Sequence, residues 1–132
     1  MCGALIMPSM AMLLGRMLLS AIFIQAGLSK LLNVGGTIAY FESLGMLLPS
    51  VVIWLVIALE VLGGLAILLG YRIRIAAGLL CLFTILAAII GHSAWNDLIH
   101  FQAFMKDLAI AGGLIYVAAN GAGLLAFDAR RD

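Results

Sequence analysis

Glu60 is the residue in this sequence best placed to do chemistry, because it lies in the middle of a long apolar stretch. A charge at the centre of a bilayer costs about 2.5–3.5 kcal/mol on insertion scales, so it needs a partner, a water cavity or a short path to the interface. Counted at about 1.5 Å of rise per residue, Arg16 in an earlier apolar stretch reaches a similar depth. We therefore expect Arg16 and Glu60 to form a buried ion pair. The pair would hold two helices together, or its carboxyl would carry a proton or anchor a ligand.

A second polar group gathers toward the other ends of the apolar stretches, at Lys30, His92, Lys106 and Asp107. One interpretation is an interface cluster, in which long lysine side chains extend their ammonium groups to water. The other is a polar pocket that binds the headgroup of a small ligand, such as a quinone carbonyl. We predict no metal site, because His92 and His100 are separated by a link of unknown shape and the sequence fixes no third ligand.

The composition requires these residues to be positioned inside a membrane. Of the 132 residues, 66% are hydrophobic and only 10% are charged, whereas soluble domains carry about 25% charged residues. The surface of the folded chain must therefore meet lipid. The net charge of +1 gives no indication of nucleic-acid binding. The sequence predicts an all-α integral membrane protein whose main partner is the lipid bilayer.

Four apolar stretches are long enough for a transmembrane helix, which needs about 20 residues. We expect the four spans at about 9–32, 50–69, 75–91 and 104–127. They form one domain covering residues 1–132. The short link 71–74 predicts an antiparallel hairpin. Apolar residues at helical spacing within 33–49 predict a short interfacial helix in the first loop.

The basic residues predict how the chain is oriented. Five belong to one side of the membrane and two to the other, namely Arg16, Arg72, Arg74, Arg130 and Arg131 against Lys30 and Lys106. Cytoplasmic loops carry an excess of lysine and arginine. We therefore expect a multi-pass protein of the plasma membrane with both termini in the cytoplasm.

Each expected span carries one face of small, polar or charged residues. In chain order these faces comprise Arg16, Ser20, Phe23, Gly27 and Lys30; Glu60, Gly64, Ile67 and Tyr71; Ala77, Cys81, Thr84, Ala88 and Gly91; and Lys106, Ala109, Gly113, Tyr116 and Asn120. Spacings of three and four residues place each set on one side of its helix. Small residues let helices approach closely in lipid. We predict a compact four-helix bundle with these faces turned inward and the glycine pairs 63–64 and 112–113 at close contacts.

The order of these features resembles the DoxX family of small bacterial membrane proteins. The matching positions are spread over nearly the whole chain, at Arg16 to Lys30, Tyr40 to Gly45, Glu60 to Gly70, Arg74, His92, Trp95, Phe104, Lys106 to Leu114 and Asp128. The chain departs from the family where Asp107 follows Lys106, since asparagine is frequent there. A four-span protein of the bacterial inner membrane is what this resemblance implies.

The resemblance also suggests a function. Some family members are associated with thiosulfate:quinone oxidoreductase, and others with a membrane complex for thiol and oxidative-stress defence. We therefore expect a membrane component of a quinone- or thiol-linked oxidoreductase system, and leave open whether the chain is itself an enzyme. No motif for a flavin, haem or iron–sulfur cluster is visible, and we expect no covalently bound cofactor. Any redox role is therefore expected to be as a quinone site or as an anchor subunit.

Two other functions remain open at this point. One is a non-enzymatic membrane scaffold or assembly factor, for which the buried ion pair would be purely structural. The other is a small proton-coupled transporter, although transporters usually have larger repeats and broken helices. Candidate protein partners are a soluble redox protein and further copies of the chain.

Overall fold

The computed structural model describes residues 2–91, 96–123 and 125–126, with side chains from residue 8 onward, and these residues contain helices and no strand. The five helices are α1 (Cys2–Leu32), α2 (Val34–Ser43), α3 (Pro49–Leu69), α4 (Ile73–Gly91) and α5 (Leu98–Asn120). By length and composition α1, α3, α4 and α5 can each cross a membrane, α1 from Pro8 onward. The prediction of an all-α protein with four apolar spans is therefore confirmed.

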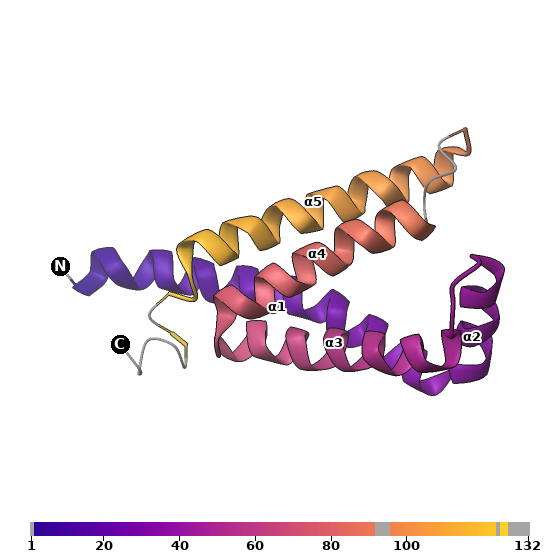
Figure 1. The fold of residues 1–132 in the computed structure, drawn as a ribbon. Helices are drawn as coiled ribbons and strands as arrows, with labels where there is room; N and C mark the ends of the chain where they lie inside the picture. Colours follow the sequence, from indigo (N-terminus) through magenta and orange to yellow (C-terminus); the bar gives the residue numbers. More distant parts are fainter. Residues whose placement is uncertain (1, 92–95, 124, 127–132) are drawn as a thin grey trace.

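The helices are arranged as two antiparallel pairs (Figure 1). Helix α3 packs along α1, and α5 packs along α4. The two pairs meet at the α3–α4 turn and diverge toward the opposite end, where α2 lies across the ends of α1 and α3. The arrangement is thus more open at the α2 end than the compact bundle that we expected.

Glycines bring α1 and α3 close together. A Cβ atom on Gly27 of α1 would lie 2.6 Å from Cγ2 of Val61, and one on Gly64 of α3 would lie 2.8 Å from Cγ1 of Ile24. Neither position has room for a larger residue unless its neighbour moves. Because Gly27 and Gly64 sit on facing helices, they set the short separation of this pair.

The two glycine pairs behave differently. Gly63 faces α4, where an added Cβ would lie 3.0 Å from Cγ of Leu80, so the pair 63–64 contacts one helix on each side as predicted. An added Cβ on Gly112 would meet nothing within 4 Å, and one on Gly113 would reach Leu19 only at an ordinary distance of 3.5 Å. The prediction of close packing at 112–113 is therefore wrong.

The bounds of α5 differ from the expected span of 104–127. The helix begins at Leu98 because the side chain of Asp97 accepts a hydrogen bond from the backbone N–H of Ile99 at 3.0 Å and caps the first turn. It ends at Asn120 because Gly121 adopts a φ of 82°, which stops a right-handed helix. Hydropathy alone missed the Asp97 cap and the glycine stop.

The predicted inward faces are correct for three of the four spans. Buried residues of these faces are Arg16, Ser20, Phe23, Gly27, Glu60, Gly64, Ile67, Ala77, Thr84 and Ala88. Tyr71 is an exception, because it lies beyond the end of α3 and is exposed. The alternation of small and polar residues therefore identified the interior of α1, α3 and α4.

The predicted inward face of α5 is wrong. Lys106, Ala109, Tyr116 and Asn120 are all exposed. The inward face instead carries apolar residues, with Ala111 and Leu114 buried against α4 and the core. Helix α5 packs like an ordinary amphipathic helix, so its polar side faces away from the other helices.

Two apolar clusters fix the shape of the molecule. One fills the space where the two helix pairs meet and includes Phe23, Ile67, Leu80 and Leu114. The other attaches α2 to α3 through Phe41, Ile53 and Ile57. Between these clusters the helix pairs diverge, and the candidate site lies there.

Candidate functional site

A pocket of about 430 Å³ lies between the diverging helix pairs. All five helices contribute to its wall, which is mostly apolar. Its polar lining residues are Lys30, Tyr40, Glu60, Thr84 and Asp107. Small-molecule sites usually measure about 300–1,000 Å³ and combine apolar walls with a few placed polar groups. In both size and lining, this pocket fits an amphipathic small molecule.

A buried ion pair lies in the pocket wall. Nζ of Lys30 is 2.8 Å from Oε1 of Glu60, with 25% of the Lys30 side chain and 2% of the Glu60 side chain exposed. The second carboxylate oxygen, Oε2 of Glu60, is buried and has no hydrogen-bond partner among the described residues. A carboxylate so fully removed from solvent depends on its cation, because an unpaired charge in this environment is strongly destabilising.

The direction of helical side chains explains why Lys30 reaches Glu60. Side chains lean toward the N-terminus of their own helix. Lys30 is in the last turn of α1, so its side chain leans inward from the α2 end of the molecule. Glu60 is near the middle of α3, which runs antiparallel to α1, so its side chain leans toward Lys30. Two residues at different depths therefore bring their charged groups together.

The predicted ion pair between Arg16 and Glu60 is wrong. The Arg16 side chain leans away from Glu60, and its Nη1 donates to the carbonyls of Ile67 at 3.3 Å and Leu68 at 3.1 Å. Its Nη2 donates to the carbonyl of Leu125 beyond α5. Arg16 thus binds carbonyl groups at the C-terminus of α3, where a helix carries partial negative charge.

An arginine also joins the two helices of the second pair, α4 and α5. Arg74, in the first turn of α4, donates from Nη1 to the carbonyls of Ala118 at 3.3 Å and Ala119 at 2.9 Å. Those carbonyls belong to the last turn of α5. Each pair therefore has an arginine on its first helix that binds the C-terminal carbonyls of the second helix, at the end of the molecule away from the pocket.

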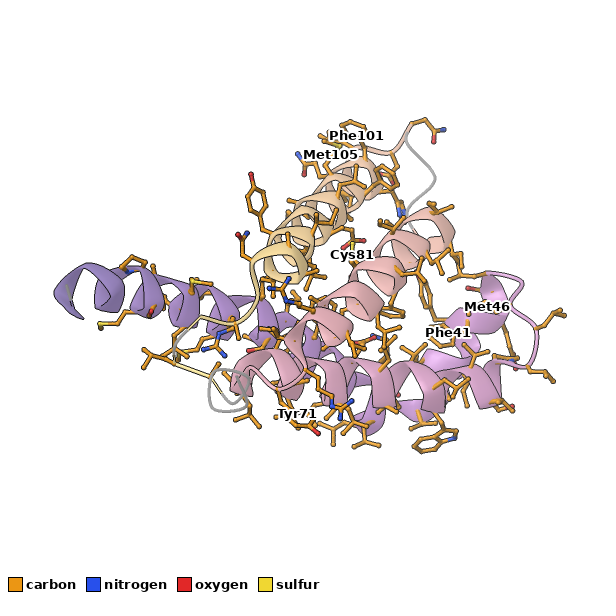
Figure 2. The ribbon with its side chains drawn as sticks, turned by 60° about the vertical axis from the view of Figure 1, so that its left-hand side comes forward. Phe41, Met46, Tyr71, Cys81, Phe101 and Met105 are labelled. Carbon is orange, nitrogen blue, oxygen red and sulfur yellow. The ribbon has the colours of Figure 1, made fainter. Side chains whose placement is uncertain are left out.

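Aromatic side chains line the pocket on several sides. Phe23 on α1 and Phe41 on α2 are buried, and Phe83 on α4 is half-buried. Figure 2 places Phe41 at the α2 end of the molecule, far from Tyr71 in the α3–α4 turn. Three phenyl rings from three helices suit a flat apolar ring, for which stacked and edge-to-face contacts are available.

Helix α2 lines the pocket at the end where the helix pairs diverge. Its Tyr40 lines the pocket and approaches the C-terminus of α4, where a Cβ added to Gly91 would lie 3.3 Å from the Tyr40 hydroxyl oxygen. Met46, just beyond α2, lines the same end. Sequence reasoning did not assign Tyr40, Phe41 or Thr84 to the site. The sequence offered one indication for Thr84, namely its position on a predicted inward face.

Of the predicted pocket residues on α5, the structure places Asp107 in the lining and Lys106 outside it. Consecutive residues of a helix point about 100° apart, so only one of the two can face inward. Ala111 and Leu114, which follow Asp107 at spacings of four and three, mark the inward face. Lys106 is exposed and does not line the pocket, so its predicted assignment to the pocket is wrong. The predicted residue His92 lies outside the described residues.

The structure also describes Cys81 and the side chains that could hold a metal ion. Cys81 is a free, half-buried cysteine whose Sγ donates a weak hydrogen bond to the carbonyl of Ala111 at 3.6 Å, so it packs between α4 and α5. Within the part of the chain that the structure describes, no three His, Cys, Asp or Glu side chains are grouped to hold a metal ion.

Two pairs of long apolar helices around an apolar pocket with a buried lysine–glutamate pair define a small multi-pass membrane protein with a candidate pocket between its spans. The chain belongs to the DoxX family, which it matches over residues 11–93. The resemblance found in the sequence is thereby confirmed.

Curated relatives cover nearly the whole chain. The Inner membrane protein YqjF of Escherichia coli (strain K12) is 37% identical over 92% of this chain and 92% of its own length. The Inner membrane protein YphA of the same organism is 32% identical over 90% of this chain and 89% of its own length. A Bacillus subtilis (strain 168) protein named "Putative oxidoreductase CatD" is 34% identical over 88% of this chain and 83% of its own length. No solved structure matches the chain.

Proposed function

We propose that the protein is a quinone-binding membrane component of an oxidoreductase system. The observation that carries this proposal is the pocket of about 430 Å³ with the Lys30–Glu60 pair in its wall. A quinone has a flat apolar ring, polar oxygens at its edge and an apolar tail. The phenylalanine walls suit the ring, and the ammonium group of Lys30 can donate to an oxygen.

The family supports the redox part of the proposal. The Bacillus relative carries an oxidoreductase name, and the two Escherichia coli relatives are named as inner membrane proteins. Because electron transfer depends on a cofactor, we infer that this chain supplies a binding site for a lipid-soluble carrier. A soluble redox protein would then supply or receive the electrons.

We further propose that both termini face the cytoplasm and that α2 lies at the outer surface of the membrane. Arg16 binds the C-terminal end of α3, so Arg16, Arg72 and Arg74 all lie at the end of the molecule away from α2. That end would face the cytoplasm. The pocket would consequently open in the outer half of the bilayer.

The outward face of α5 supports contact with another protein. Lys106, Tyr116 and Asn120 are exposed on it, and polar groups on a spanning helix usually face protein or a water-filled cavity rather than lipid. We propose this face as the contact with a second copy of the chain or with a redox partner.

The proposed function is tested by equilibrium binding. The purified protein in nanodiscs is titrated with short-chain ubiquinone and menaquinone analogues, and saturable binding is expected. Lys30→Ala should weaken that binding, whereas Lys106→Ala is the matched control and should leave it unchanged, because Lys106 lies outside the pocket. If neither analogue binds saturably, the proposal is wrong.

The two alternatives give different results. A scaffold or assembly factor needs the Lys30–Glu60 pair only for stability. Lys30→Ala would then lower the melting temperature, and no quinone analogue would bind. A proton-coupled transporter would move solute into proteoliposomes in response to a pH gradient. Among the described residues, α1, α3, α4 and α5 are continuous helices, unlike the broken helices common in transporters.

A further inference from the structure

Glu60 presents an acceptor to the pocket that nothing in the described chain uses. Its Oε1 accepts from Lys30 at 2.8 Å, while its Oε2 is buried without a hydrogen-bond partner among the described residues. Buried carboxylate oxygens normally accept hydrogen bonds, since leaving one unpaired costs the full desolvation of that group. Because Glu60 lines the pocket, a molecule bound there can supply the missing donor.

We propose that the pocket recognises the reduced, hydroxyl-bearing form of its ligand, so that a quinol binds in preference to the corresponding quinone. One quinol hydroxyl would donate to Oε2 of Glu60, and its oxygen would accept from Nζ of Lys30. This inference rests on the proposed function, because it specifies which redox form of the lipid-soluble carrier occupies the same pocket.

The ion pair is suited to a group that is both donor and acceptor. Lys30 uses one ammonium hydrogen on Glu60 and has two others to donate, and Glu60 has a free acceptor beside them. A hydroxyl matches both groups at once. A quinone carbonyl only accepts, so it would satisfy Lys30, leave Oε2 unpaired and place its own lone pairs near a carboxylate.

The pocket walls favour an aromatic hydroxyl over an aliphatic one. Phe23, Phe41 and Phe83 contribute phenyl rings from three different helices. Aromatic pairs in such arrangements gain energy beyond the area they bury. A long-chain alcohol would make the same hydrogen bonds without these ring contacts, and would bind more weakly.

The test compares ligands on the intact protein in nanodiscs under anaerobic conditions. Kd is measured calorimetrically for decylubiquinone, for its quinol, for the dimethyl ether of the quinol and for decanol. Because a hydrogen bond to a charged group is among the stronger ones, we expect the quinol to bind about tenfold or more tightly than the quinone. The dimethyl ether, which has no donor, should bind no better than the quinone.

A variant then assigns the preference to Glu60. Glu60→Gln replaces a carboxylate oxygen with an N–H donor, so the ratio of quinone Kd to quinol Kd should fall about tenfold or more. Glu42→Gln is the control, because Glu42 is exposed on α2 and is not among the pocket residues. It should keep the wild-type ratio.

The outcomes separate this inference from the proposed function. Equal binding of quinol and quinone, or tighter binding of the quinone, would overturn the inference and leave a quinone site in place. Decanol binding as tightly as the quinol would also overturn it, because the rings would then have no role. If no ligand binds saturably, the proposed function fails as well. Should Glu60→Gln not fold, the four wild-type Kd values decide the question.

Discussion

Nζ of Lys30 lies 2.8 Å from Oε1 of Glu60, and this contact joins the last turn of α1 to the middle of α3. Its position is unusual for a lysine near the end of a spanning helix, because such side chains generally extend outward to the interface. Here the ammonium group turns inward and meets a carboxylate that is almost fully buried. The pair places both charged groups in the wall of the pocket.

Replacing Lys30 should destabilise the protein by stranding the Glu60 charge. For Lys30→Met we expect a loss of about 3 kcal/mol in the free energy of unfolding, at the lower end of the range for broken buried pairs, because a quarter of the Lys30 side chain is exposed. Thermal unfolding in detergent measures the change. Lys106→Met is the control on an exposed position and should change stability by less than about 0.5 kcal/mol.

Replacing Arg16 should loosen the other end of the molecule. Arg16→Leu removes its hydrogen bonds to carbonyls of Ile67, Leu68 and Leu125, and hydrogen bonds to charged groups contribute about 1.5–3 kcal/mol each. We expect a clear fall in melting temperature together with faster proteolysis after residue 120. Lys106→Leu, which removes an exposed basic residue that makes none of these hydrogen bonds, should leave both unchanged. Equal effects of the two substitutions would contradict the proposed role of Arg16.

Two glycine-to-alanine substitutions should have opposite effects. Gly27→Ala places a Cβ 2.6 Å from Cγ2 of Val61, and overpacking of this kind typically costs about 1–3 kcal/mol. Gly112→Ala meets nothing within 4 Å and replaces a poor helix former, so it should be neutral or stabilising by up to about 1 kcal/mol. Unfolding curves of the two variants make the comparison. A stable Gly27→Ala protein would show that α1 and α3 are farther apart than described.

The orientation is tested by labelling engineered cysteines in intact cells. In a chain with Cys2→Ser and Cys81→Ser, a cysteine at Ser43 on α2 should react with a membrane-impermeant maleimide added outside. A cysteine at Tyr71, in the turn at the opposite end, should react only after the cells are permeabilised. Both positions are exposed, so accessibility within the fold does not bias the comparison. The reverse pattern would place the pocket in the cytoplasmic half of the bilayer.

The sequence was sufficient to predict the spans and much of the interior. Long apolar runs can only be helices in lipid, and the small and polar positions around Ser20, Gly64 and Thr84 do face inward. The helix in the first loop was also predicted, and it forms α2. These features follow from local composition and helical periodicity.

The site was predicted only in part, for physical reasons. Depth counting compared Cα positions and ignored the lean of side chains, so it paired Glu60 with Arg16 instead of Lys30. On α5, polar residues are expected inside a bundle, but Lys106 and Asn120 face outward, because a helix at the edge of the molecule needs only an apolar strip to pack. The contribution of Phe41 and Tyr40 depended on how α2 crosses the end of α3, and periodicity does not specify that crossing.

The central claim, that Glu60 is paired with Lys30 and not with Arg16, is tested most directly by double-mutant cycles. The free energy of unfolding is measured for Lys30→Met, Glu60→Leu and their combination, and for the same cycle with Arg16→Leu. We predict a coupling energy of at least about 2 kcal/mol between Lys30 and Glu60, since removing both charges relieves the penalty of removing one. For Arg16 and Glu60 we predict additivity within about 0.5 kcal/mol. Additive Lys30 and Glu60 substitutions, or strong coupling of Glu60 to Arg16, would contradict the pairing of Glu60 with Lys30.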